Sequence, residues 1–299
     1  MEFTDTQWAW PWWAVMVIIN AINLIIAALI IKRTACSNDA VTAAYQKRML
    51  IMGAVFVIVG AYRSVFVSRY LTQMAWFDNF ANSALLIRMF AFCAELSFAG
   101  LFALALLQIN KDLPPNNHNS GLIKFINTKS PYCLFICIFI AQFFATSGLI
   151  FKNSTLFSIE ETLWTIGFMS IMPLAFMQLR RVLTIRDEIE KRKIKMLASF
   201  IKLTIAWGVI YCSYGLFYHL PFENWASAID QIETGLPAIK SGFNAVTDAF
   251  TIVNETKQYG DWGFGFLLWH SCYFSVCVWI AIFLMRGPRK IESQSHGIT

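Results

Sequence analysis

The sequence predicts an all-α membrane protein, a bundle of seven transmembrane helices with the N-terminus outside and the C-terminus in the cytoplasm. Of its 299 residues, 57% are hydrophobic and only 14% are charged, a balance outside the range of soluble domains. Seven apolar segments are long enough to cross a hydrocarbon core of ~30 Å, which takes roughly 20 residues. Seventeen of the 24 Lys and Arg residues follow the first, third, fifth and seventh segments. Because such basic loops stay in the cytoplasm, this alternation predicts the orientation.

The first three spans run inward, outward and inward again. The first opens with four tryptophans and ends at Lys32 and Arg33. The second follows a loop with two further basic residues and contains Arg63 near its outer end. The third contains Arg88 and ends before the sequence Lys111-Asp-Leu-Pro-Pro, whose two prolines indicate a stop followed by a loop.

The last four spans complete one membrane domain. The fifth contains Pro173, which a membrane helix tolerates when its neighbours satisfy the freed carbonyl. Residues 180–195 carry seven positive charges, with acidic residues four positions before basic ones, so we expect a continuous helix between spans five and six. The seventh span ends at Arg286. We place the spans at about residues 8–31, 49–67, 85–107, 132–151, 162–179, 196–218 and 262–285 of a single transmembrane domain covering residues 1–299.

Two outer connections have helical apolar spacing. In residues 68–84, Tyr70, Met74 and Phe77 predict a turn of interfacial helix. Residues 222–254, between spans six and seven, predict an extracellular amphipathic helical cap. Its stripe could cover the bundle mouth, contact lipid headgroups or meet the same helix of a second subunit; it consists of Leu236, Ile239, Phe243, Val246, Phe250 and Val253. A third connection contains Asn153-Ser-Thr, a glycosylation triplet of a kind that also recurs by chance.

Polar residues inside the spans are candidate functional residues, because each is costly in a bilayer unless it is paired. Asn20, Glu95, Gln142 and His270 lie ~12–15 Å below the outer end of their helices, so they could form one layer. Arg88 and Glu95 are seven residues apart, or ~10.5 Å along the helix, and we expect them not to pair. Glu95 could instead meet His270, and Arg88 could either meet Glu223 or be shared with water in a vestibule. Either these groups fix helix packing, or they bind a ligand together with nearby aromatic residues; the predicted ligand-binding set is Arg63, Arg88, Glu95, His270, Trp269 and Tyr273.

Metal and cofactor sites have little support in the sequence. His219, His270 and Glu95 are weak metal candidates, but no HExxH or paired-cysteine motif is present. The layout of seven helices is similar to that of microbial rhodopsins and seven-helix receptors. However, no lysine lies between Lys257 and Lys290, where a retinal Schiff base would need one. We therefore expect neither a metal nor retinal. The sequence does not identify a cofactor or catalytic residues, and nucleic acid is not an expected partner.

These observations lead to three functional hypotheses. The first is an integral protein of the plasma (inner) membrane whose outward-opening polar and aromatic cavity binds a small molecule or lipid, in a sensing or binding role. An aromatic cage for a cation or a polyene would be one form of it. The second is a transporter of protons, ions or small solutes that uses Glu95 and His270 as protonation sites. The third is an intramembrane metal-dependent enzyme. The lipid bilayer is the expected partner, and the outer stripe could also support a homo-oligomer.

Overall fold

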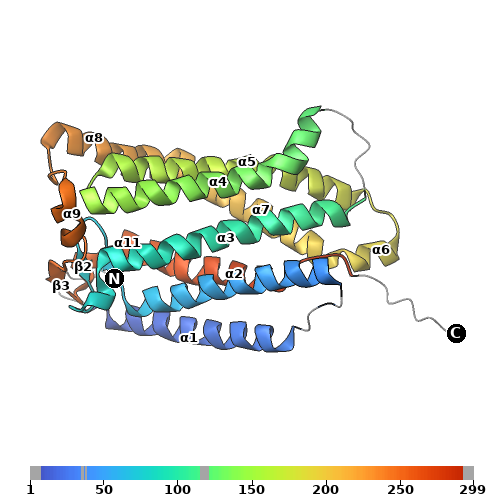
Figure 1. The fold of residues 1–299 in the computed structure, drawn as a ribbon, viewed down its shortest axis with the longest axis horizontal. Coiled ribbons are helices and arrows are strands. Elements are labelled where there is room, and N and C mark those ends of the chain that lie inside the picture. The colour runs from blue at the N-terminus through green and yellow to red at the C-terminus, as the bar shows by residue number, and fades with distance from the viewer. Residues whose placement is uncertain (1–7, 35–36, 38, 115–120, 292–299) are drawn as a thin grey trace.

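The computed structural model describes residues 8–34, 37, 39–114 and 121–291, and these contain seven helices long and apolar enough to cross a membrane. Five are single α-helices: α1 (Trp10–Arg33), α2 (Ala40–Val65), α3 (Ala84–Asp112), α4 (Gly121–Phe151) and α5 (Ser154–Leu183). The sixth joins α7 (Lys195–Tyr214), η2 (Gly215–Asn224) and α8 (Trp225–Thr234), and the seventh joins α11 (Phe264–Cys272), η3 (Tyr273–Cys277) and α12 (Val278–Leu284). They lie lengthwise in one bundle (Figure 1), which supports the predicted mainly helical integral membrane protein with seven candidate spans.

The two ends of the bundle differ (Figure 1). We call the end with α8, α9 (Gly242–Asp248) and three short strands the cap end, and the end with α6 (Glu188–Lys193) the basic end. At the basic end the predicted continuous helix over residues 180–195 is wrong, because α5 ends at Leu183 and α6 is separate. The carboxylate of Asp187 accepts a hydrogen bond from the Ile189 N–H at 2.9 Å and caps α6. A residue in this capping position has non-helical backbone, so the helix is interrupted there.

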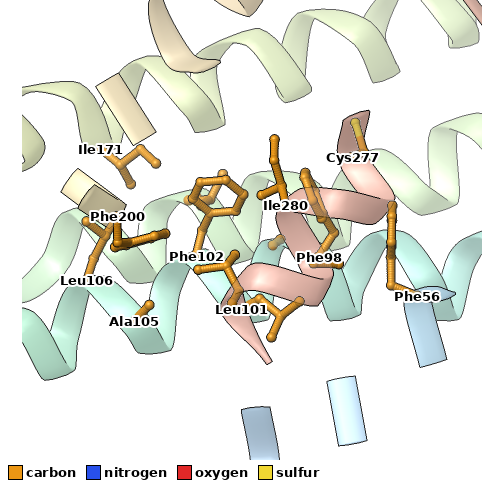
Figure 2. Close-up of a cluster of buried hydrophobic side chains, with 14 of the residues drawn as sticks. Phe56, Phe98, Leu101, Phe102, Ala105, Leu106, Ile171, Phe200, Cys277 and Ile280 are labelled. Carbon is orange, nitrogen blue, oxygen red and sulfur yellow. The ribbon is translucent and has the colours of Figure 1, made fainter. Parts of the chain in front are cut away.

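The core is aromatic and centred on α3. In the most apolar stretch of α3, 61% of the residues are buried, against 22% in α1, so α3 is central and α1 peripheral. Phe98 of α3 stacks on Phe56 of α2 with ring centroids 4.7 Å apart, and Phe102 packs edge-on against Phe168 of α5 at 5.6 Å. Figure 2 shows these side chains of α3 meeting those of its neighbours in the middle of the bundle. This apolar layer separates the basic end from the polar residues near the cap end.

The start of α5 differs most from the predicted spans. The side chain of Asn153 accepts hydrogen bonds from the backbone N–H groups of Thr155 and Leu156, at 2.9 and 3.3 Å. This is a helix cap, because it satisfies N–H groups that have no partner within the helix. As a result α5 begins at Ser154, eight residues before the predicted start at 162, and Glu160 lies inside the helix.

The sixth helix continues beyond its predicted end at residue 218. Its segment η2 is π-helical and contains Pro221. Proline lacks an N–H and its ring clashes with the preceding turn, so the helix widens here instead of keeping its regular hydrogen bonds. The helix resumes as α8 and ends at Gly235, whose φ of +68° suits glycine. The first part of the predicted cap is therefore an extension of the sixth helix.

The predicted amphipathic helix through Leu236–Val253 is not continuous. Residues 235–241 are not helical, and α9 covers only seven residues. Pro237 and two glycines with positive φ, Gly235 and Gly242, interrupt the backbone despite the regular apolar spacing. Two members of the stripe, Val246 and Phe250, pack with the ends of α3 and α4. The other four are exposed: Leu236, Ile239, Phe243 and Val253.

A small sheet replaces the interfacial helix predicted for residues 68–84. Strand β1 (Ser68–Arg69) pairs antiparallel with β2 (Met74–Ala75), and β2 pairs in parallel with β3 (Asn254–Glu255). The short helices η1 (Phe80–Asn82) and α10 (Tyr259–Trp262) flank it. After β2, Trp76 is fully buried and stacks on Trp13 of α1 at 5.7 Å. The helical spacing fails here because a partner 180 residues away along the chain, which local periodicity cannot report, holds this backbone extended.

The position of α9 depends on one carboxylate. Asp248 Oδ2 lies 2.5 Å from Lys240 Nζ and 3.5 Å from Lys152 Nζ, so it joins α9 to the end of α4. Partial burial alone would raise the pKa of Asp248, but the hydrogen bonds and charges of the two lysines outweigh it and hold this pKa below its ordinary value of 3.8. A lowered folded-state pKa stabilises the folded cap above the ordinary pKa, and this contribution is lost as the pH falls below it.

We expect acid to release α9 selectively. Hydrogen-exchange protection of residues 240–253, corrected for the intrinsic exchange rate, should fall between about pH 5 and pH 3, while protection of α3 stays constant. Asp248→Asn should already be less protected at pH 5 and should show little further change. Equal pH dependence in the two proteins would contradict this role of Asp248.

Candidate functional site

Four ionisable side chains are buried together below the cap end, and we call them the ionic cluster. They are Arg63 of α2, Arg88 and Glu95 of α3, and Glu160 of α5, each 3–6% exposed. Arg88 contacts both carboxylates, with Nη2 2.8 Å from Glu95 and Nη1 3.5 Å from Glu160. Arg63 Nη1 lies 3.9 Å from Glu95, and Gln142 of α4 accepts a hydrogen bond from Arg88. The cluster thus joins four helices.

The contact between Arg88 and Glu95 corrects the expectation that they would not pair. Their backbones are two helical turns apart, but both side chains are long. Side chains on a helix lean toward its N-terminus, so Glu95 leans toward Arg88, and the guanidinium reaches back to meet it. The expected contacts of Glu95 with His270 and of Arg88 with Glu223 are not formed, because the arginines take the carboxylate of Glu95 and Arg88 takes Glu160.

The formal charges of the cluster balance, because it contains two arginines and two glutamates. Moving such groups out of water costs several kcal/mol per ion, and pairing offsets that cost only when the geometry is good. Removing one member leaves an uncompensated charge in a medium that cannot solvate it. The cluster therefore fixes the relative positions of α2, α3 and α5.

The other predicted polar residues lie beside the cluster. The guanidinium carbon of Arg63 lies 4.8 Å from the ring centroid of Phe274 and 5.8 Å from that of Tyr273. His270 is buried, with its ring packed against Trp12 and Phe274 at 5.2 and 4.4 Å. A separate hydrogen bond of 2.7 Å joins Asn20 of α1 to Ser64 of α2. The expected single layer of polar groups is therefore divided into distinct contacts.

A cavity of about 540 Å³ opens at the cap end, between β1, the start of α5, η2, α8 and the start of the seventh helix; we call it the cap-end cavity. Its lining is rich in aromatic side chains, of which there are six: Tyr70, Phe157, Tyr214, Trp262, Phe266 and Trp269. The ionisable residues among its other lining groups are Arg69, Glu161, His219 and Glu223. Of the predicted ligand-binding residues, Trp269 lines this cavity.

His219 lies between the two carboxylates of the cavity. Its Nε2 is 3.7 Å from Glu161 of α5, and its Nδ1 contacts Glu223 one turn later in η2. The imidazole stacks on Tyr214, with centroids 5.2 Å apart and planes within 19° of parallel. The Tyr214 hydroxyl also donates to Glu223 at 3.3 Å. Two carboxylates and an aromatic face thus converge on one position.

The cavity adjoins the ionic cluster at two points. Tyr70 lines the cavity, and its hydroxyl accepts a hydrogen bond of 2.9 Å from Arg63 Nη2. Glu161 lines the cavity, while the preceding residue, Glu160, belongs to the cluster. Tyr273 stacks on Trp269 at 5.3 Å, and so links the cavity wall to the residues around Arg63.

The sequence prediction missed Glu160, Glu161 and Tyr70 because it placed the first two in a loop and the third in an interfacial helix. The available signal was Asn153, which predicts a helix starting before the two glutamates. His219 was predicted as a weak metal candidate and was not included in the predicted ligand-binding set. Within the described residues, no group of three or more His, Cys, Asp or Glu side chains is arranged to hold a metal ion.

Comparison with known proteins adds no family to this description. No protein-family model matches the chain, and no curated protein or solved structure is similar to it at a significant level.

We expect the ionic cluster to be required for stability. Arg88→Met should lower the free energy of unfolding in detergent by about 3–5 kcal/mol, because it leaves two buried carboxylates without their main partner. The double variant Arg88→Met with Glu160→Gln should recover part of this loss. Lys191→Met is the matched control: its partner Glu188 is exposed, so the change should stay below about 1 kcal/mol. Equal effects of Arg88→Met and Lys191→Met would contradict the assignment.

Proposed function

We propose that this chain is an integral membrane protein that binds a small molecule in the cap-end cavity, as a sensor or binding protein. The observation that carries the proposal is the cavity, whose volume of about 540 Å³ falls within the roughly 300–1,000 Å³ of small-molecule sites. Such sites combine apolar walls with a few convergent polar groups. Six aromatic rings and the convergence of Glu161, His219 and Glu223 match that description.

We further propose that the cap end faces outward from a plasma (inner) membrane. Support comes from the distribution of basic residues: α1, α3, α5 and α12 all end in, or lead into, basic sequence at the basic end. At the cap end, by contrast, Lys152 and Lys240 pair with Asp248, and Lys257 pairs with Glu255. The rule that basic loops stay inside then favours an outer cap and an inner C-terminus.

Transport is the second candidate function, and the position of the ionic cluster favours it. A solute or proton entering the cavity would next meet the buried, ionisable groups of the ionic cluster, and such groups in membrane proteins commonly mark transport pathways. Flux through reconstituted vesicles that depends on Glu95 or Glu160 would support transport. Ligand binding without flux would support the sensing or binding role.

The orientation predicts that an epitope tag on the C-terminus is inaccessible in intact cells and becomes accessible only after permeabilisation. A second tag inserted after Thr234, in the exposed connection between α8 and α9, should be accessible in both conditions. The reverse pattern would place the cavity on the cytoplasmic side.

Binding in the cavity predicts a selective effect of filling it. Gly265 lines the cavity, and a Cβ added there meets nothing within 4 Å, so Gly265→Trp has room to project into the space. Gly121, at the other end of the bundle, is equally unobstructed, and Gly121→Trp is the matched control. In a thermal-shift screen of cationic, anionic and neutral compounds, at least one class should raise the Tm of the native protein and of Gly121→Trp but not of Gly265→Trp. Shifts that survive Gly265→Trp would place binding elsewhere.

A further inference from the structure

We propose that the ligand of the cap-end cavity is a small organic cation, an amine or quaternary ammonium compound with an apolar body. This inference rests on the proposed binding function and specifies its ligand. The feature that carries it is the convergence of Glu161 and Glu223 on a single position beside the face of Tyr214.

The two carboxylates come from different helices and point to the same place. Glu161 lies on α5 and Glu223 on η2, yet both contact the imidazole of His219. Their side chains are 26% and 45% exposed, so each can reach a ligand while remaining within the cavity wall. When His219 is neutral, two negative charges at one position attract a cation and repel an anion.

The aromatic lining favours an organic cation over a metal ion. Cations bind to the faces of aromatic rings, and tryptophan is the best of these partners. Tyr214 already presents its face to the imidazole, and Trp269 and Phe266 extend the aromatic wall. Hard inorganic cations such as Ca²⁺ and Mg²⁺ bind oxygen ligands and would not use the rings, whereas a cation with an apolar body would use both the carboxylates and the rings.

The cavity contains two groups that can be positively charged, Arg69 and His219, and a ligand would have to compete with His219 for the two carboxylates. Arg69 is exposed, and its Nη1 donates to the backbone carbonyl of Asp261 at 3.4 Å. His219 is the group between the carboxylates, and when protonated it acts as an internal cation there. The groups facing it are Glu161 from α5, Glu223 from η2, and Tyr214 from α7, with Arg69 across the cavity. A ligand ammonium and protonated His219 would therefore compete for the same two carboxylates.

The direct test uses benzyltrimethylammonium as the probe, with titration calorimetry on the purified full-length protein. We expect it to bind at least tenfold more tightly than its uncharged carbon isostere neopentylbenzene and than the anion benzenesulfonate. Glu161→Gln and Glu223→Gln should each weaken binding at least tenfold with the Tm nearly unchanged. Glu188→Gln, an exposed carboxylate at the basic end, is the matched control and should leave binding unchanged.

The pH dependence tests the competition with His219. Binding of the probe should tighten as the pH rises, because His219 loses its proton and releases the carboxylates, whereas the charge of the quaternary ammonium does not change. His219→Gln should flatten this dependence. A flat profile in the native protein would contradict the competition.

The cation could come from a free amine or from the choline headgroup of a lipid. If the natural ligand is a choline headgroup, phosphatidylcholine should compete with the probe, so the probe should bind more weakly in phosphatidylcholine nanodiscs than in phosphatidylglycerol nanodiscs. The Glu161→Gln variant, measured in both lipids, corrects for the effect of surface charge on the probe. Equal affinities would indicate a free cation. Both results support the same chemistry.

The outcomes separate this inference from the proposed function. Equal binding of the three probes, preference for the sulfonate, or insensitivity to Glu161→Gln would overturn the cationic ligand. If another class of compound then binds and is blocked by Gly265→Trp, the binding function stands without this inference. If no compound is blocked by Gly265→Trp, both fail.

Discussion

Two arginines and two glutamates buried among the helices must neutralise one another, because the bundle interior offers no water to solvate them. This constraint determines how α2, α3 and α5 are positioned. Each helix places a charged side chain at the depth of its partner on the next helix. Sliding one helix by one turn along its neighbour would therefore separate the paired groups by ~5.4 Å. Arg88 is the central member because it contacts carboxylates on two helices and Gln142 on a third. The aromatic packing around Phe98 then fills the space below.

The cavity lies where the helices depart from regular geometry. The sixth and seventh helices both contain π-helical segments, η2 and η3; η2 lines the cavity, and η3 follows directly after the α11 residues that line it. A widened turn changes which side chains face inward, and such segments often occur at functional sites. In η2, Pro221 explains the widening, and the same segment carries His219 and Glu223. The helices α3, α4 and α5 are each assigned as one α-helix without such a segment.

Much of the fold could be predicted from sequence, because apolar length and charge alternation are properties of single segments. The predictions that failed concern helix ends, backbone interruptions and contacts between distant segments, which apolar length and charge do not report. The cap of α5 by Asn153 was not recognised, which left Glu160 outside the predicted span. Apolar spacing in the cap predicted a helix that Gly235 and Pro237 prevent. The sheet and the cluster depend on contacts between segments distant in the chain. Local periodicity therefore predicted several helices of the candidate site but not the strand pairing or the ion pairs.

Adjacent residues couple the cavity to the cluster. A cation held at Glu161 would lie next to Glu160, whose charge is already shared with Arg88. At an effective dielectric constant near 20, a unit charge ~8 Å away changes the energy of a buried ion by about 2 kcal/mol. Such a change is comparable to the net free energy of an ion pair, so the charge of a bound ligand would alter the contacts between α3 and α5. Tyr70 provides a second route, because its hydroxyl holds Arg63 from the cavity side. If the cavity binds a cation as we propose, the same arrangement that stabilises the bundle would let its helices respond to an occupied cavity.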